Sequence, residues 1–295
     1  MTDGDWDVLL TRIDDRRCTP FLGAGVNDGL LPLGGQIASE WSRQFQYPLK
    51  DNDDLARVSQ FLAVRHNDGL YPKDLILKRL KISPDTFNSA VNEGRLACLS
   101  ALAKLPLHFY ITTNYDDLLS RCLQRMGRTP LRDFCRWNKE IRKLPSIFAA
   151  KTAIETGDGN PIVFHMHGNE QERRSLVLTE DDYLDFLISI SANKKLVPPR
   201  IQQAISDSSL LFIGYGMRDI NFRVIHRGLV QQLESGLRPM SVSVQLSHDD
   251  ESSRLYLEQY FKGMYVQIYW GSASEFAAEL LSRWQGSRAK DASCS

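Results

Sequence analysis

Six short apolar runs recur along the chain, and each ends where polar or turn-forming residues begin. Near-continuous apolar runs of this length are typical of strands buried on both faces of a parallel sheet. The segments between them repeat apolar residues at helical spacing, as Leu55, Val58 and Leu62 do. The pattern therefore predicts an α/β fold with helices on both faces of a parallel sheet. The predicted strands are 18–22, 107–113, 161–167, 209–215, 241–246 and 264–270.

The long interval between the first two runs has a different pattern. Residues 36–105 show helical periodicity and no clear strand, so we expect a helical insertion or small lobe there. A last helix is predicted over 272–284, with a serine three residues before Glu275 as its cap. The residues of the tail are small and polar, which predicts disorder over 286–295. The rest of the chain is predicted to form a single domain over 8–285.

Composition excludes several classes of protein. Lys plus Arg and Asp plus Glu both number 36, so the net charge is zero and no direct nucleic-acid binding is expected. The five cysteines are scattered without a CxxC pair, which favours reduced thiols and no zinc knuckle. The acidic N-terminus lacks a signal-peptide pattern and no stretch has the length of a membrane span. The sequence predicts a cytoplasmic protein without a membrane partner.

Two polar stretches follow the first two predicted strands. In FLGAGVN, Gly23 and Gly25 would let an anion approach the backbone, although a plain strand-to-helix turn explains them equally well. In FYITTNYDDLL, several polar groups including Asn114 and Asp116 converge, whereas a helix cap needs only one. Ligands of open parallel sheets bind at the carboxyl ends of strands, so a functional role is favoured.

Two further stretches repeat this arrangement. PIVFHMHGN places His165 and His167 two residues apart, on the same face if the segment is a strand. A histidine there is a candidate general base, but two could also be metal ligands, and one could be structural. LLFIGYGMRD adds a second glycine turn and Asp219, which could bind hydroxyls of a dinucleotide or cap a helix.

Taken in order, FLGAG, TTNYD, FHMHG followed by LVLTEDDYLDFL, and FIGYGMRD resemble the sirtuin-like domains of bacterial antiviral NAD-hydrolysing proteins. The resemblance spans about residues 18–285 and implies a Rossmann-like NAD-binding domain with a helical insertion. Protein-deacylating sirtuins hold a structural zinc with two CxxC pairs, and this chain has neither. The resemblance is therefore to the zinc-free branch of the family.

The resemblance implies roles residue by residue. Asn114 and His167 match the catalytic asparagine and histidine, which leaves His165 as the supporting or structural member of the pair. The residues that it implies for NAD binding are Gly23, Ala24, Gly25, Asn27, Thr113, Asp116, Gly214, Tyr215 and Asp219.

The function that follows is cleavage of NAD to nicotinamide and ADP-ribose by the effector of an anti-phage defence system. A hydrolase that depletes NAD would kill its host unless restrained, and we expect no second large domain after residue 285. We therefore expect a homo-oligomer and a separately encoded regulator, an ATPase or an Argonaute-like protein. The alternatives are an NAD-dependent protein deacylase and a non-catalytic sensor of NAD or ADP-ribose.

Overall fold

A single parallel sheet forms the centre of the molecule. The computed structural model describes residues 1–149, 156–216, 239–246 and 250–293, with only the backbone of 290–293. Seven strands lie in the order β3-β4-β2-β1-β5-β6-β7, and every neighbouring pair is parallel. The predicted α/β fold with a Rossmann-like parallel sheet is thus confirmed. The strands are β1 (Cys18–Leu22), β2 (Phe109–Thr112), β3 (Leu131–Phe134), β4 (Ile162–His165), β5 (Ser209–Ile213), β6 (Ser241–Gln245) and β7 (Val266–Trp270).

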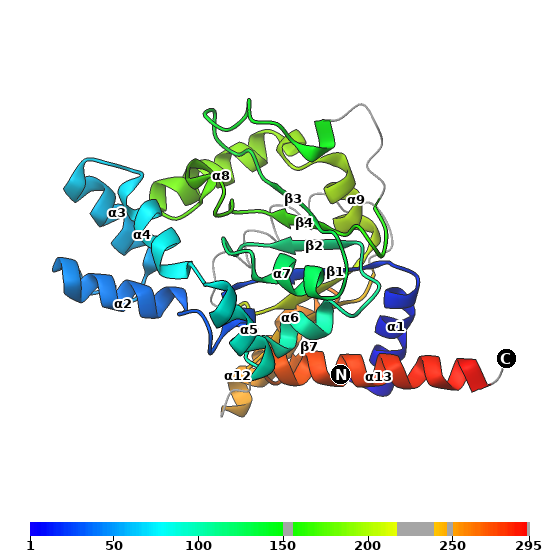
Figure 1. The fold of residues 1–295 in the computed structure, drawn as a ribbon. Coiled ribbons are helices and arrows are strands. Elements are labelled where there is room, and N and C mark those ends of the chain that lie inside the picture. Colours follow the sequence, from blue (N-terminus) through cyan, green and yellow to red (C-terminus); the bar gives the residue numbers. More distant parts are fainter. Residues whose placement is uncertain (150–155, 217–238, 247–249, 294–295) are drawn as a thin grey trace.

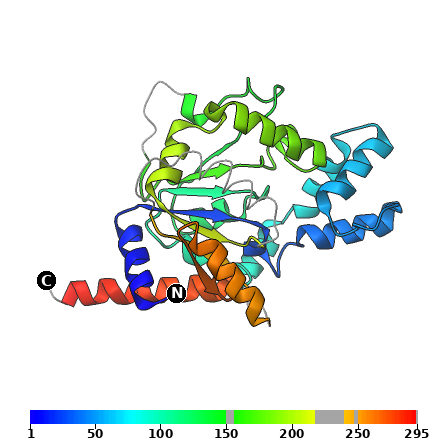
Figure 2. The same ribbon diagram turned by 180° about the vertical axis from the view of Figure 1, so that it is seen from behind.

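Helices cover both faces of this sheet, which is why β1, β5 and β6 are buried at every residue. Figure 1 shows one face, where α5 (Pro84–Asn92), α6 (Ala97–Leu102) and α7 (Leu118–Arg125) share a core with α1 (Asp3–Asp14) and α13 (Ala273–Ser293). Figure 2 shows the opposite face, where α8 (Glu180–Ala192), α9 (Pro199–Asp207) and α12 (Glu251–Lys262) pack on a second core. Each apolar strand therefore buries side chains on both sides.

Strand β1 marks the point where the strand order reverses. The chain goes from β1 to β2, β3 and β4 on one side, and then returns to β5, β6 and β7 on the other. In open parallel sheets, ligands bind at the carboxyl ends of the strands beside such a switch point. The loops after β1, β2 and β5 are therefore the expected binding region.

Six of the seven strands lie within predicted runs, and β3 is the exception. Its sequence, Leu-Arg-Asp-Phe, is four residues long and half charged, so it lacks the apolar run that marked the others. It lies at the edge of the sheet and pairs only with β4 in the part of the chain that the structure describes. Edge strands tolerate such composition because one side of the strand needs no partner.

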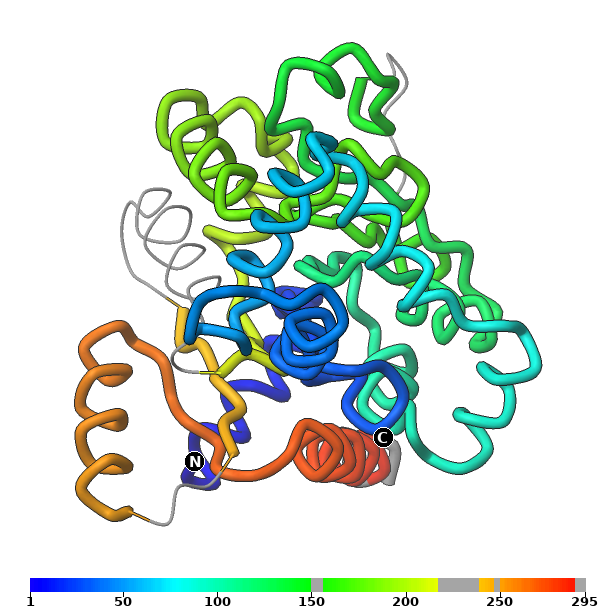
Figure 3. The backbone as a smooth tube through the Cα atoms, turned by 90° about the vertical axis from the view of Figure 1, so that its left-hand side faces the viewer, coloured from blue at the N-terminus to red at the C-terminus, as the bar shows by residue number. Residues whose placement is uncertain are grey.

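The interval predicted to be a helical insertion holds α2 (Gly34–Phe45), α3 (Leu55–His66), α4 (Tyr71–Leu80) and then α5 and α6. The first three share a small core that also takes in Leu176 and Leu178, which follow β4. Figure 1 shows this lobe beyond one end of the strands, and Figure 3 shows it in the foreground with α13 seen nearly end-on below it. The domain limits, 8–285, stay a prediction.

The C-terminal helix is longer than the sequence suggested. It begins with the predicted cap, since the amide of Glu275 donates to Ser272 Oγ over 3.1 Å. It then continues to Ser293, into the segment for which disorder was predicted. Trp284 anchors this part, because its Nε1 donates to Asp14 Oδ1 over 2.8 Å. Among the described residues, every helix is too short or too polar to cross a membrane.

Candidate active site

The glycine loops after β1 and β5 pack directly against each other at the switch point. The amide of Gly23 donates to Ile213 O over 2.9 Å and that of Gly25 to Gly214 O over 3.0 Å. A Cβ at Gly23 would lie 2.6 Å from Gly214 O, and Gly214 has a φ of +81°. Glycine is thus required by the contact between the two loops, independently of any ligand. Ala24 is the exposed residue, and phosphate binding here stays a prediction.

Asn114 lies beside these loops, and three hydrogen bonds hold its backbone and side chain at the carboxyl ends of the strands. Its amide donates to Thr112 Oγ1 over 3.0 Å, and its side-chain Nδ2 donates to Gly23 O over 3.1 Å. Its carbonyl accepts a hydrogen bond of 2.9 Å from His165 Nδ1. The structure therefore brings the predicted catalytic asparagine to the first glycine loop, as a shared dinucleotide crevice requires.

Thr113 and Tyr215 join the same edge. The two hydroxyls share a hydrogen bond of 3.2 Å, and the buried Tyr215 hydroxyl also donates to Leu22 O over 3.1 Å. The amide of Thr113 donates to that same carbonyl over 3.0 Å. The loops after β1, β2 and β5 are consequently tied together by side chains that the sequence singled out.

Asn27, which follows β1, and Asp116, which follows β2, are joined by a partly buried hydrogen bond. Asn27 Nδ2 donates to Asp116 Oδ2 over 2.8 Å, while Oδ1 of the same carboxylate accepts from the Leu118 amide at the start of α7 over 3.0 Å. Burial raises the pKa of Asp116 to about 6. Asp116 is therefore not the N-cap of α7, which is Asp117, but its carboxylate binds the first amide of the helix and also contacts a second predicted site residue.

A small internal cavity of about 10 Å³ adjoins this pair and has room for about one water molecule. Asn27 Oδ1 and Ser120 Oγ are buried beside it without a hydrogen-bond partner among the described residues. Asn114 and His165 line the same space.

The two histidines of FHMHG have separate surroundings, because β4 ends at His165 and the alternation of a strand stops there. His165 is buried, with Nδ1 on Asn114 O and Nε2 3.4 Å from Arg132 Nη2. Burial and the Arg132 charge lower its pKa to about 4, so the ring is neutral at physiological pH.

His167 packs instead among aromatic rings of α8. Its ring lies 4.9 Å from that of Phe186 and 5.6 Å from that of Tyr183, both edge-on. Its Nε2 is buried and has no hydrogen-bond partner among the described residues. Burial lowers its pKa to about 3. The next residue, Gly168, has a φ of +84°, and a Cβ there would lie 2.3 Å from the Ser175 backbone, which explains the sharp turn away from the sheet.

The sequence missed two residues beside His165. Arg132 comes from the unpredicted strand β3, and its guanidinium binds Glu170 through two hydrogen bonds of 2.7 and 2.6 Å. Arg132 and Glu170 are 38 positions apart, so no local spacing indicates the pair. In the parallel register of β3 and β4, Arg132 pairs with Val163 and Phe134 pairs with His165, so Arg132 lies two positions from the histidine along the strands.

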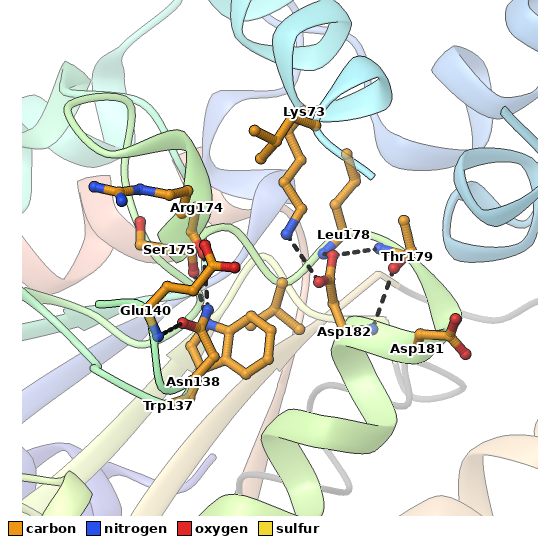
Figure 4. Close-up of polar contacts among 12 residues, drawn as sticks. Lys73, Trp137, Asn138, Glu140, Arg174, Ser175, Leu178, Thr179, Asp181 and Asp182 are labelled. Atoms are coloured by element: carbon orange, nitrogen blue, oxygen red, sulfur yellow. Dashed lines mark hydrogen bonds and ion pairs between the residues drawn. The ribbon is translucent and has the colours of Figure 1, made fainter. Parts of the chain in front are cut away.

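The segment after His167 is clamped from both sides, as Figure 4 shows. On one side, Trp137 Nε1 donates to Ser175 O over 2.8 Å and Asn138 Nδ2 donates to Arg174 O over 2.9 Å. These contacts fix the turn that carries the chain from His167 toward α8.

On the other side, the helical insertion contacts the start of α8. Lys73 of α4 is only 6% exposed, and its Nζ forms an ion pair of 2.8 Å with Asp182 Oδ1. The other oxygen of Asp182 accepts from the amides of Leu178 and Thr179, each over 3.0 Å, and Thr179 Oγ1 caps the helix in return. Asp182 is therefore both a helix cap and the partner of a buried cation.

Asp219, the residue expected at the adenosine half of a dinucleotide, lies outside the described residues. Among the residues that are described, no three side chains of His, Cys, Asp or Glu come together as ligands of a metal ion would.

Comparison with known proteins gives the family. A model of the SIR2-like domain matches residues 108–266, more than half of the chain, and this range includes Asn114, both histidines and Tyr215. The chain belongs to the SIR2-like domain family. The predicted resemblance to sirtuin-like domains is thereby confirmed.

Several curated proteins are distant relatives of this SIR2-like chain. The NAD(+) hydrolase ThsA of Cytobacillus dafuensis is 25% identical over 219 residues, which are 74% of this chain and 39% of that protein. The protein of the same name from Enterococcus faecium is 28% identical over 140 residues, 47% of this chain and 26% of the relative. Defense-associated sirtuin 2 of Bacillus subtilis is 25% identical over 169 residues, 56% of this chain and 15% of the relative. The chain spans well under half the length of each.

Proposed function

We propose that this SIR2-like chain hydrolyses NAD to nicotinamide and ADP-ribose. The observation that carries the proposal is the convergence of Asn114, Tyr215 and the two glycine loops at the switch point of the sheet. This is the region in which an open parallel sheet binds a dinucleotide. The relatives named as NAD(+) hydrolases support the choice of reaction.

The reaction breaks the bond between a cationic pyridinium and the ribose, so its transition state resembles an oxocarbenium ion. Asn114 is proposed to orient the ribose hydroxyls and the attacking water with its side-chain amide, which Gly23 O now holds. The loop residues Ala24, Thr113 and Tyr215 are proposed to line the NAD crevice. Asp219 is proposed for the adenosine half.

His167 is proposed as the general base that accepts a proton from the water or from a ribose hydroxyl. Its orphaned Nε2 supports this assignment, because a buried ring nitrogen without a partner is open to a ligand. Tyr183 and Phe186 lie edge-on against the ring, and its burial keeps the pKa of His167 at about 3. Base catalysis therefore requires α8 to shift, so that water reaches Nε2 and the pKa rises toward neutrality.

We further propose that the protein acts in the cytoplasm in defence against phage. The name of the Bacillus subtilis relative, a defense-associated sirtuin, supports a role in defence. An unrestrained NAD hydrolase would be toxic, so we expect activity to depend on homo-oligomerisation and on a separately encoded ATPase or Argonaute-like regulator. Purification of the chain with its neighbouring gene products, followed by mass determination of the intact assembly, tests both expectations.

The direct test is release of nicotinamide and ADP-ribose from NAD by the purified chain, measured by chromatography beside Asn114→Ala and His167→Ala. We expect turnover only in the wild type, with all three proteins folded by circular dichroism. Arg79→Gln, which removes an exposed ion pair with Glu40, is the matched control and should retain full turnover.

Two other outcomes identify the alternatives. Nicotinamide release that depends strictly on an added acetyl-lysine peptide would indicate a deacylase. Binding of NAD without release, also after addition of the neighbouring gene products, would indicate a sensor.

A further inference from the structure

Both ring nitrogens of His165 are engaged, and the two contacts require the same tautomer. The carbonyl oxygen of Asn114 can only accept, so His165 Nδ1 must carry the hydrogen of the 2.9 Å bond. A guanidinium can only donate, so Nε2 presents its lone pair to Arg132 Nη2 at 3.4 Å. A neutral ring protonated on Nδ1 satisfies both neighbours, and neither the other tautomer nor the imidazolium does.

Arg132 is itself held in one orientation. Its Nη1 and Nη2 each donate to one oxygen of Glu170, over 2.7 and 2.6 Å, which is the paired geometry that fixes a guanidinium plane. The two side chains are 15% and 33% exposed, so the pair is largely shielded from solvent. Arg132 Nη2 therefore faces both the ring of His165 and the carboxylate of Glu170.

Glu170, the partner of Arg132, also contacts the loop that carries Asn114. Its backbone amide donates to Tyr115 O over 2.9 Å. Neighbouring carbonyls of the loop, those of Asn114 and Tyr115, are therefore held by His165 and by Glu170. Through these contacts, the edge strand β3 reaches the proposed catalytic asparagine.

We propose that Arg132 is a positioning residue for the reaction at Asn114: it fixes the Nδ1–H tautomer of His165, and this tautomer holds the Asn114 carbonyl. Neither Arg132 nor His165 touches the reacting atoms in this assignment. Their effect is on the orientation of the asparagine side chain over Gly23. The part of the proposal that concerns turnover rests on the proposed function, whereas the tautomer does not.

The tautomer is measured directly by NMR on the full-length chain labelled with ¹⁵N-histidine. Long-range proton–nitrogen spectra distinguish the two neutral tautomers and the imidazolium, and His165→Asn assigns the signals by their loss. We expect the Nδ1–H form in the wild type at neutral pH. In Arg132→Gln we expect the Nε2–H form or the imidazolium to become populated, because Glu170 then lacks its cation and attracts a ring proton.

Arg79→Gln is again the matched control and should leave the His165 signals unchanged, since its ion pair with Glu40 is exposed. The proposal is overturned if the wild type shows the Nε2–H form. It is also overturned if Arg132→Gln and the wild type give the same His165 signals.

Kinetics test the consequence for Asn114. We expect Arg132→Gln to lower kcat by about 10–100-fold with little change in KM, the size of effect expected when a catalytic group is misplaced by about 1 Å. His165→Asn places an amide donor where Nδ1 lies and should retain more turnover than His165→Ala. Equal losses in the two His165 variants, or a change in KM alone, would contradict the positioning role.

Failure of the proposed function is a separate result. If the wild type releases no nicotinamide, the assignment of NAD hydrolysis fails while the tautomer experiment still decides the role of Arg132.

Discussion

The surroundings of His165 and His167 differ, although the two residues are two positions apart and both are buried. His165 lies in a polar region in which each ring nitrogen has a partner, Asn114 on one side and Arg132 on the other. His167 lies in an aromatic region, against Tyr183 and Phe186, and its Nε2 has no partner among the described residues. A ring with both nitrogens satisfied is suited to hold a neighbour, whereas a ring nitrogen without a partner leaves hydrogen-bonding capacity unused.

The two regions are also anchored by different ion pairs. Glu170 holds Arg132 beside His165, whereas Asp182 ties α8, which covers His167, to Lys73 of the insertion. The polar region is thus part of the sheet edge, and the aromatic region depends on a contact between two helices. We expect the region around His167 to move more readily.

The largest expected effect is on NAD turnover, and together with stability it distinguishes His167 from His165. His167→Leu should lower NAD turnover by about 10²–10⁴-fold, the usual contribution of a general base. Its free energy of unfolding should stay within about 1 kcal/mol of the wild type, because leucine has a similar volume and removes an unsatisfied buried nitrogen. Urea unfolding and nicotinamide release measure the two quantities.

His165→Leu is the matched variant for this comparison. It leaves Asn114 O without its donor and Arg132 facing an apolar side chain, so it should cost about 2 kcal/mol or more of unfolding free energy. Equal stability losses in the two leucine variants would remove the distinction between the polar and the aromatic regions.

The next effect concerns the anchor of α8. Lys73→Met should lower the free energy of unfolding by about 3–5 kcal/mol, because it leaves the carboxylate of Asp182 buried without its cation. Hydrogen exchange should show the loss of protection concentrated in α8 and in the residues before it. A loss below about 1 kcal/mol would mean that the amides of Leu178 and Thr179 suffice for Asp182.

The sequence predicted the fold better than the site for a physical reason. Strands buried on both faces need continuous apolar runs, which are visible in the sequence, whereas the edge strand β3 does not need one and was missed. The placement of Asn114 and Gly23 at one sheet edge followed from strand ends alone. The separation of His165 from His167 did not, because it depends on β4 ending at His165 and on the turn at Gly168.

Ion pairs between residues far apart in the chain could not be predicted from the sequence either. Arg132 with Glu170, and Lys73 with Asp182, join residues that only the tertiary structure brings together, and each residue alone resembles an ordinary surface charge. The glycines at 23 and 214 show the reverse case. Their presence was evident, but the contact between their two loops, which also requires glycine, was not.

A smaller effect is expected in the pH dependence of stability. His167 has a pKa of about 3 when folded and about 6.5 when unfolded, so only the unfolded chain gains its proton as the pH falls below about 6.5. Between pH 7 and 5 this should cost the wild type about 2 kcal/mol, and His167→Leu should lack that loss. His165 acts in the same direction, and Asp116, whose pKa is raised to about 6, acts in the opposite one.

For that reason the measurement is the difference between wild type and His167→Leu in urea unfolding at each pH. His165 and Asp116 contribute equally to both proteins and cancel. If the two pH profiles run parallel, His167 is accessible to protons in the folded protein, and its aromatic cover is not closed in solution.

The smallest effect comes from the residues adjacent to the buried anchor. Asp74 follows Lys73 in α4 and binds Arg173 with two contacts of 3.0 and 2.7 Å, but these side chains are 40% and 49% exposed. Arg173→Gln should therefore cost less than about 1 kcal/mol, and high salt should abolish even that cost. Lys73→Met should keep most of its cost in salt, because its ion pair with Asp182 is largely buried. A loss for Arg173→Gln that does not depend on salt would contradict this comparison. It would mean that burial does not decide how much each ion pair of α4 contributes to the free energy of unfolding.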